Sequence, residues 1–184
     1  MENSNPFSIR NYHPDDFDHL LNLINHCSRS DAEPFSLTAI QLKDRLIAPD
    51  TIPAKDVFIV ESSALWIVAY AEGFQRSRAN EQLFLTRASI LPAFRHQRIG
   101  TALLSELWTR VVELSVQENK TTILGARVNS NNKFARLLFE QFNMQHERTL
   151  IEMVCALSTG IPQVLIPSGI ELIRWREYGE ISSV

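Results

Sequence analysis

Residues 90–104 read ILPAFRHQRIGTALL, and this stretch decides the fold of the chain. The apolar run that precedes it, over residues 83–91, predicts a strand that ends at Pro92. From about residue 99 to residue 118, apolar residues recur at helical spacing, which makes this the clearest helix pattern in the sequence. The stretch is therefore predicted to form a strand, a short turn and a long helix in direct succession.

A turn of this kind can hold an anion. The N–H groups in the first turn of a helix have no intrahelical partners, and the helix dipole adds about 0.3–1 kcal/mol per anionic group there. Gly100 would let a phosphate approach the main chain, and Arg95 and Arg98 would add charge-assisted hydrogen bonds, which favours a diphosphate ligand. From spacing alone, a connection that needs one glycine for its geometry explains the stretch equally well. The stretch is neither a GxxxxGK[ST] nor a GxGxxG motif.

The remaining elements are predicted from hydrophobic periodicity, capping residues and prolines. In chain order they are a strand over residues 7–12, helices that open at Pro14 and at Ser36, a hairpin of strands 57–60 and 64–71, the strand and helix described above, a strand over 120–128, a helix over 131–142 and a strand over 150–157. Strands and helices in this order indicate a mixed α/β fold.

The composition is that of one ordinary globular domain. The chain has 184 residues, 45% of them hydrophobic and 21% charged, and a domain of this size buries roughly 70% of its unfolded surface without help from a metal or a disulfide. The formal net charge of -3 gives no support for a nucleic-acid or membrane partner. Cys27 and Cys155 lie far apart outside any Cys-x-x-Cys pattern, which favours core packing over a disulfide or a nucleophile. No signal peptide or membrane span is visible, so a cytoplasmic location is expected.

Two segments resemble motifs of the GNAT superfamily of N-acetyltransferases. The acetyl-CoA signature of that superfamily, V-x-P-x-x-R-G-x-G-I-G-x-x-L, is matched at Ile90, Pro92, Arg95, Ile99, Gly100, Leu103 and Leu104. Its second motif, N-x-x-A-x-x-L-Y-E-x-x-G-F, is matched at Asn132, Ala135, Leu138 and Glu140. The order of elements is also similar, so the resemblance implies an acyl-CoA N-acyltransferase fold over residues 1–157. That fold has a mixed, mostly antiparallel central sheet flanked by helices.

The resemblance implies acetyl-CoA as co-substrate, bound without a metal. Main-chain groups at Ile90 and Leu91 would pair with the pantetheine arm as an added strand would. The pyrophosphate would be wrapped, mainly by N–H groups, by Arg95, His96, Gln97, Arg98, Ile99, Gly100, Thr101 and Ala102. Asn132 would hydrogen-bond the pantetheine region, or cap the last helix, or both, and Phe139 is also expected to contact the cofactor.

Three departures from these motifs bear on binding and catalysis. Arg98 stands where the signature has glycine, which costs about 1–2 kcal/mol if the position needs a left-handed backbone. A second register, over residues 97–102, satisfies the short form Q/R-x-x-G-x-G/A, but the step from Ile90 and the helix phase favour the Arg95 register. Phe139 replaces the tyrosine that often protonates the leaving thiolate, a role typically worth about 10²–10⁴-fold in rate. Asn143 and Met144 replace the final Gly-Phe.

The reaction that the resemblance implies is direct attack by a neutral amine on the acetyl thioester. An N–H group near Ile90 would polarise the thioester carbonyl. Glu72 and Glu81 are the candidate bases by position, although carboxylates at strand ends are usually solvated. The acceptor, a small-molecule or peptide amine, has no readable motif. Two functions stay open: an N-acetyltransferase acting on a primary amine, and a catalytically weak acyl-CoA-binding domain with a regulatory or dimerisation role, which Phe139 favours.

Residues 158–184 allow two interpretations. Pro162, Pro167 and Gly169 predict a linker that leads to a final strand of the same domain. Alternatively, PSGIELIRWREYGE resembles the opening of a second domain of the superfamily, as in tandem members such as mycothiol synthase-like proteins. The chain would then be one half of a tandem protein.

Overall fold

The computed structural model of the chain describes residues 7–31, 36–63, 67–78, 81–151, 153 and 165–171. The chain divides into two compact units, Met1–Gln145 and His146–Val184. The described residues of the second unit form no helix or strand. In the described part of the chain, no helix is both long enough and apolar enough to cross a membrane.

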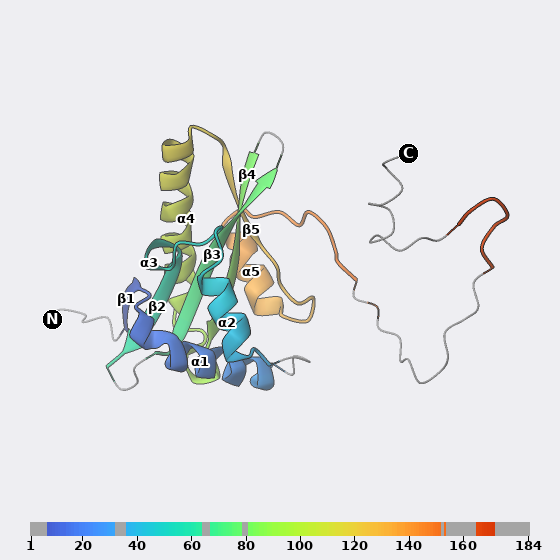
Figure 1. Ribbon diagram of the computed structural model, residues 1–184. Coiled ribbons are helices and arrows are strands. Elements are labelled where there is room, and N and C mark those ends of the chain that lie inside the picture. Colours follow the sequence, from blue (N-terminus) through green and yellow to red (C-terminus); the bar gives the residue numbers. More distant parts are fainter. Residues whose placement is uncertain are drawn as a thin grey trace. The chain divides into compact units, whose positions relative to one another are not determined.

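The first unit is built on a five-stranded sheet (Figure 1). In spatial order, which is also chain order, its strands are β1 (Phe7–Asn11), β2 (Val57–Ser62), β3 (Ala69–Arg78), β4 (Glu81–Ile90) and β5 (Thr122–Ala126). The first four strands are antiparallel to their neighbours, and β5 is parallel to β4. Parallel neighbours need a crossover connection, which the helix α4 (Ile99–Glu118) supplies. The predicted mixed α/β fold with a mostly antiparallel sheet is confirmed.

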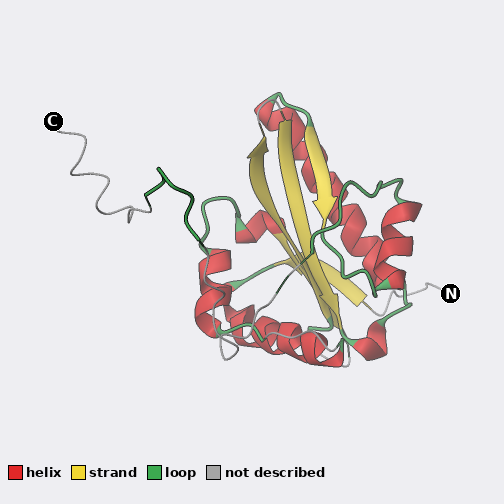
Figure 2. Ribbon diagram, turned by 90° about the vertical axis from the view of Figure 1, so that its right-hand side faces the viewer, coloured by secondary structure: helices red, strands yellow, loops and turns green. Residues whose placement is uncertain are grey.

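Helices cover both faces of this sheet (Figures 1 and 2). On one face, Leu103, Leu107 and Val111 of α4 join the core with sheet residues such as Phe84, and α5 (Lys133–Gln141) packs beside them. On the other face, α1 (Phe17–Ser30) and α2 (Ala39–Leu46) bury their apolar stripes against the sheet. Cys27 is buried in this second core, as predicted, while Cys155 lies outside the described residues.

Several predicted boundaries are wrong. Strand β3 starts at Ala69 rather than at residue 64 and continues to Arg78, because it pairs with β4 along its full length, from Ala69↔Ile90 to Arg78↔Glu81. Helix α2 is capped by Thr38, whose side chain accepts from the Gln41 N–H, and not by Ser36. In the strand predicted over 150–157, the described residues Leu150, Ile151 and Met153 are exposed and lie in no strand.

Candidate functional site

The motif stretch forms the predicted strand, turn and helix. Strand β4 ends at Ile90, a short 3-10 helix (Pro92–Phe94) follows, and α4 begins after residues 95–98. We call residues 95–101 the α4 turn. Arg98 precedes α4 without a side-chain cap, and within the described chain the N–H groups of residues 96–101 donate to no main-chain carbonyl. A row of unpaired N–H groups at the start of a 20-residue helix is an arrangement that binds anions.

Two residues of the α4 turn have a left-handed backbone. His96 and Arg98 both have φ of 63°, and both stand where the resembled signature has glycine. A residue with a β-carbon is strained there by about 1–2 kcal/mol. Arg98 therefore does carry the strain that a left-handed backbone imposes on a residue other than glycine. His96 is a second position strained in the same way. The turn keeps the backbone of the glycine motif without its glycines.

Replacing Arg98 by glycine should raise the free energy of unfolding by about 0.5–1 kcal/mol. Relief of the left-handed strain, about 1–2 kcal/mol, exceeds the added entropy of the unfolded chain, about 0.4–1 kcal/mol. Urea unfolding monitored by circular dichroism measures the difference. Gln97→Gly is the control, because Gln97 has no positive φ and its replacement should only destabilise. Equal losses in both variants would contradict the strain at Arg98.

Beside this turn, β4 and β5 separate. They pair from Gln82↔Thr122 to Thr86↔Ala126, whereas β4 continues to Ile90 alongside β3. The Leu91 N–H donates to the Val68 carbonyl at 2.9 Å, on the β3 side. Since successive residues of a strand direct their main-chain groups to opposite edges, those of Ile90 point to the β5 side. The end of β4 thus presents main-chain groups beyond the last β5 partner, where an extended ligand can lie.

Arg95 is held by the protein itself. Its Nε donates to the Ile90 carbonyl at 3.0 Å, and its Nη1 and Nη2 donate to Asp31 Oδ1 and Oδ2 at 2.7 and 2.9 Å. The hydrogen bond to Asp31 raises the pKa of Arg95, so its charge is permanent. Asp31 follows α1 directly, and the paired side chains link the end of that helix to the end of β4. Arg98, in contrast, is exposed and forms no ion pair with any described residue.

The second motif segment packs against the first. Asn132 caps α5, its Oδ1 accepting from the Ala135 N–H at 3.0 Å, as one of its two predicted roles requires. A β-carbon built on Gly100 would lie 3.0 Å from Leu138 Cδ2, so glycine permits the close contact between α4 and α5. Phe139 is half-buried and packs on the core beneath α4.

Neither candidate base suits a reaction beside Ile90. Glu72 is 3% exposed in the middle of β3, and its Oε1 lies 2.7 Å from Arg87 Nη1 and 3.8 Å from Arg45 Nη1. The expectation that Glu72 is a solvated carboxylate at a strand end is therefore wrong, because Glu72 is a buried ion-pair partner. Glu81 is exposed at the first residue of β4, while Ile90 is its last. At about 3.4 Å per residue the two lie about 30 Å apart.

Burial raises the pKa of Tyr70, and the nearby Glu72 carboxylate raises it further. This phenol is consequently protonated at neutral pH.

Within the described residues, no group of three or more His, Cys, Asp or Glu side chains lies together as a metal site would require.

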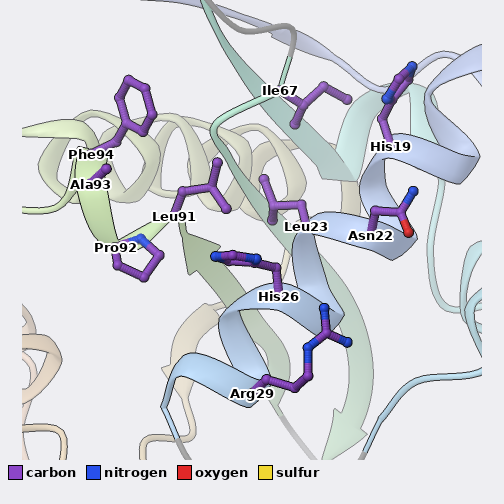
Figure 3. Close-up of a pocket in the computed structure, with 10 residues that line it drawn as sticks. All are labelled: His19, Asn22, Leu23, His26, Arg29, Ile67, Leu91, Pro92, Ala93 and Phe94. Atoms are coloured by element: carbon purple, nitrogen blue, oxygen red, sulfur yellow. The ribbon is translucent and has the colours of Figure 1, made fainter.

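A groove of about 590 Å³ lies between α1 and residues 91–94 (Figure 3). One wall carries polar side chains of α1, namely His19, Asn22, His26 and Arg29, and the other wall is apolar, with Ile67, Leu91, Pro92, Ala93 and Phe94. The apolar periodicity of α1 did not reveal this wall. The sequence did contain a signal for this wall, because the polar side chains of α1 recur at steps of three and four residues, which places them on one side of the helix.

No protein-family model and no curated protein matches the sequence. Solved structures match its fold. A GCN5-related N-acetyltransferase from Sphaerobacter thermophilus aligns with a TM-score of 0.61 at 19% identity, over 75% of this chain and 43% of that chain. An aminoglycoside acetyltransferase from an uncultured soil metagenomic sample, in complex with sisomicin, aligns with a TM-score of 0.60 at 14% identity, over 85% and 99%.

A third structure, yncA from Salmonella typhimurium with its cofactor acetyl-CoA, aligns with a TM-score of 0.58 at 18% identity, over 75% of this chain and 79% of that chain. The fold is thus the acyl-CoA N-acyltransferase fold of GCN5-related N-acetyltransferases. The aligned region spans less than half of the Sphaerobacter chain.

Proposed function

We propose that the chain is an N-acetyltransferase that transfers the acetyl group of acetyl-CoA to a primary amine. The observation that carries this proposal is the α4 turn. Its N–H groups at residues 96–101 have no main-chain partners among the residues that the structure describes, and it lies at the point where β4 leaves β5. In this fold, that combination fits a ligand with a diphosphate and an extended amide-containing arm.

Each residue has a defined part in this proposal. The N–H groups of residues 96–101 hold the diphosphate, while the main-chain groups of Ile90 and the Asn132 side chain orient the arm. The N–H groups of Leu91 and Ala102, which the sequence also suggested, already donate to the Val68 and Arg98 carbonyls at 2.9 and 3.0 Å, so they take no part. Bound acetyl-CoA supplies an activated thioester, and an N–H group of β4 on the β5 side polarises its carbonyl. Arg95, already paired with Asp31, fixes the Ile90 carbonyl and does not contribute free charge to the diphosphate.

The acceptor most compatible with this site is an amine that is readily neutral. Deprotonating a lysine-like amine at pH 7 costs roughly 4–5 kcal/mol, whereas an α-amine costs about 1 kcal/mol. Neither Glu72 nor Glu81 is placed to take the proton at Ile90. An α-amine therefore needs less help than a long-chain amine does.

A second candidate function is an acyl-CoA-binding domain with a regulatory or dimerisation role, which Phe139 at the tyrosine position favours.

We further propose residues 1–157 as the acetyltransferase domain and 158–184 as a linker to a final strand or to a second domain.

Acetyl-CoA at 100 times its dissociation constant should stabilise the protein by about 2.7 kcal/mol. Thermal unfolding with and without the ligand measures this, and pantetheine, which lacks the diphosphate, is the control and should stabilise less. Thiol release with a panel of amines then separates the two functions. Binding without amine-stimulated release would leave only the acyl-CoA-binding domain, and no stabilisation would remove both.

A further inference from the structure

Phe134 is an exposed aromatic residue in contact with the α4 turn. It lies in the first turn of α5 and is 69% exposed. Its ring meets the His96 imidazole edge to face, with centroids 4.6 Å apart and planes at 76°. His96 belongs to the α4 turn, so this contact holds the phenyl ring beside the N–H groups of residues 96–101 while most of the ring remains open to solvent.

Each of the two aromatic residues has a cationic residue close to it in the sequence. Lys133 precedes Phe134, and Arg98 lies two residues after His96; both are exposed. The carboxylate of α5, Glu140, is already paired with Arg136 at 3.0 Å. An open aromatic ring beside a row of N–H donors suits a nucleotide, whose base stacks and whose phosphates accept hydrogen bonds.

We propose that Phe134 is a stacking surface for the purine base of a nucleotide whose diphosphate lies on the α4 turn. This inference rests on the proposed function for the diphosphate and adds a residue that selects the nucleotide end of the ligand. The edge contact with His96 restricts the Phe134 side chain before the ligand arrives, which lowers the entropy lost on stacking. Carriers with a base, such as CoA, are thereby distinguished from phosphopantetheine, which has none.

The test compares the affinities of the full chain for CoA, ADP and 4′-phosphopantetheine by isothermal titration calorimetry. Phe134→Ala should weaken CoA and ADP about tenfold, within the range measured for loss of one base–aromatic stack, and should leave phosphopantetheine unchanged. Phe134→Tyr should retain the affinity for CoA. Leu137→Ala is the matched control, since Leu137 is 54% exposed on the same helix and its loss should change nothing. Circular dichroism establishes that each variant is folded.

Equal weakening of CoA and phosphopantetheine in Phe134→Ala would overturn the stacking surface, as would unchanged CoA affinity. If the wild-type chain binds no CoA, the proposed function fails, and ADP alone then decides the inference. Binding of ADP that Phe134→Ala abolishes would support it, and absence of ADP binding to the wild type would overturn it.

Discussion

Replacing Asp56 by alanine should lower the free energy of unfolding by about 3–5 kcal/mol. Asp56 is fully buried at the end of the helix α3 (Pro53–Asp56) and accepts from Arg110 Nε of α4 at 2.7 Å and from the Ile52 N–H at 2.6 Å. Arg110 is itself only 4% exposed. Without Asp56, a buried guanidinium keeps, among the described residues, only the partly exposed Glu113 as an ion-pair partner, at 3.1 Å. Urea unfolding measures the loss.

Two controls separate the buried pair from general effects of losing a charge. Glu140→Ala removes an exposed partner of Arg136 on α5, and a surface pair of this kind contributes about 0.3–0.5 kcal/mol. The double variant Asp56→Ala with Arg110→Met should recover much of the stability, because a thioether side chain needs no counter-charge. A loss below about 1 kcal/mol for Asp56→Ala would show that water or Glu113 satisfies Arg110.

The fold could be predicted from sequence wherever a local pattern determines an element. The 3.6-residue repeat of α4 and the proline after β4 are such patterns, and the strand, turn and helix lie where they were expected. The boundaries of β3 could not be predicted, because its outer half, with Gln75 and Arg76, is polar and is defined by pairing with β4. The Asp56–Arg110 pair joins residues 54 positions apart and has no local signal.

In the candidate site, too, features set by a local pattern could be predicted, and features that depend on distant residues could not. The turn before α4 and the Asn132 cap follow from spacing and residue type, and the described residues contain both a turn whose N–H groups lack main-chain partners and the cap. The arrangement of Arg95 could not be predicted, since its partner Asp31 lies 64 residues earlier in the chain. For the same reason, the burial of Glu72 between two arginines was not visible in a sequence that shows only its nearest neighbours.

Replacing Phe139 by tyrosine should raise the rate of acetyl transfer by about 10²-fold, the lower end of what general acid catalysis contributes. Phe139 stands at the tyrosine position of the second motif. Leu138, the residue before it, would touch a β-carbon at Gly100, so this part of α5 lies against the start of α4. A phenol here could protonate the leaving thiolate, which the phenyl ring cannot do. Thiol release under saturating acetyl-CoA and amine measures the rate.

The pH dependence distinguishes a proton donor from a change in packing. A phenol donates only while protonated, so the Phe139→Tyr rate should fall as the pH rises through the phenol pKa, ordinarily about 10, whereas the wild-type rate has no such limb. Phe142→Tyr is the matched control: Phe142 is also half-buried on the same core, at the end of α5, and its change should add neither rate nor limb. The prediction is contradicted if the Phe139→Tyr variant binds acetyl-CoA normally but keeps the wild-type rate. Protonation of the thiolate would then not limit turnover, and Phe139 would no longer favour the acyl-CoA-binding function over the acetyltransferase.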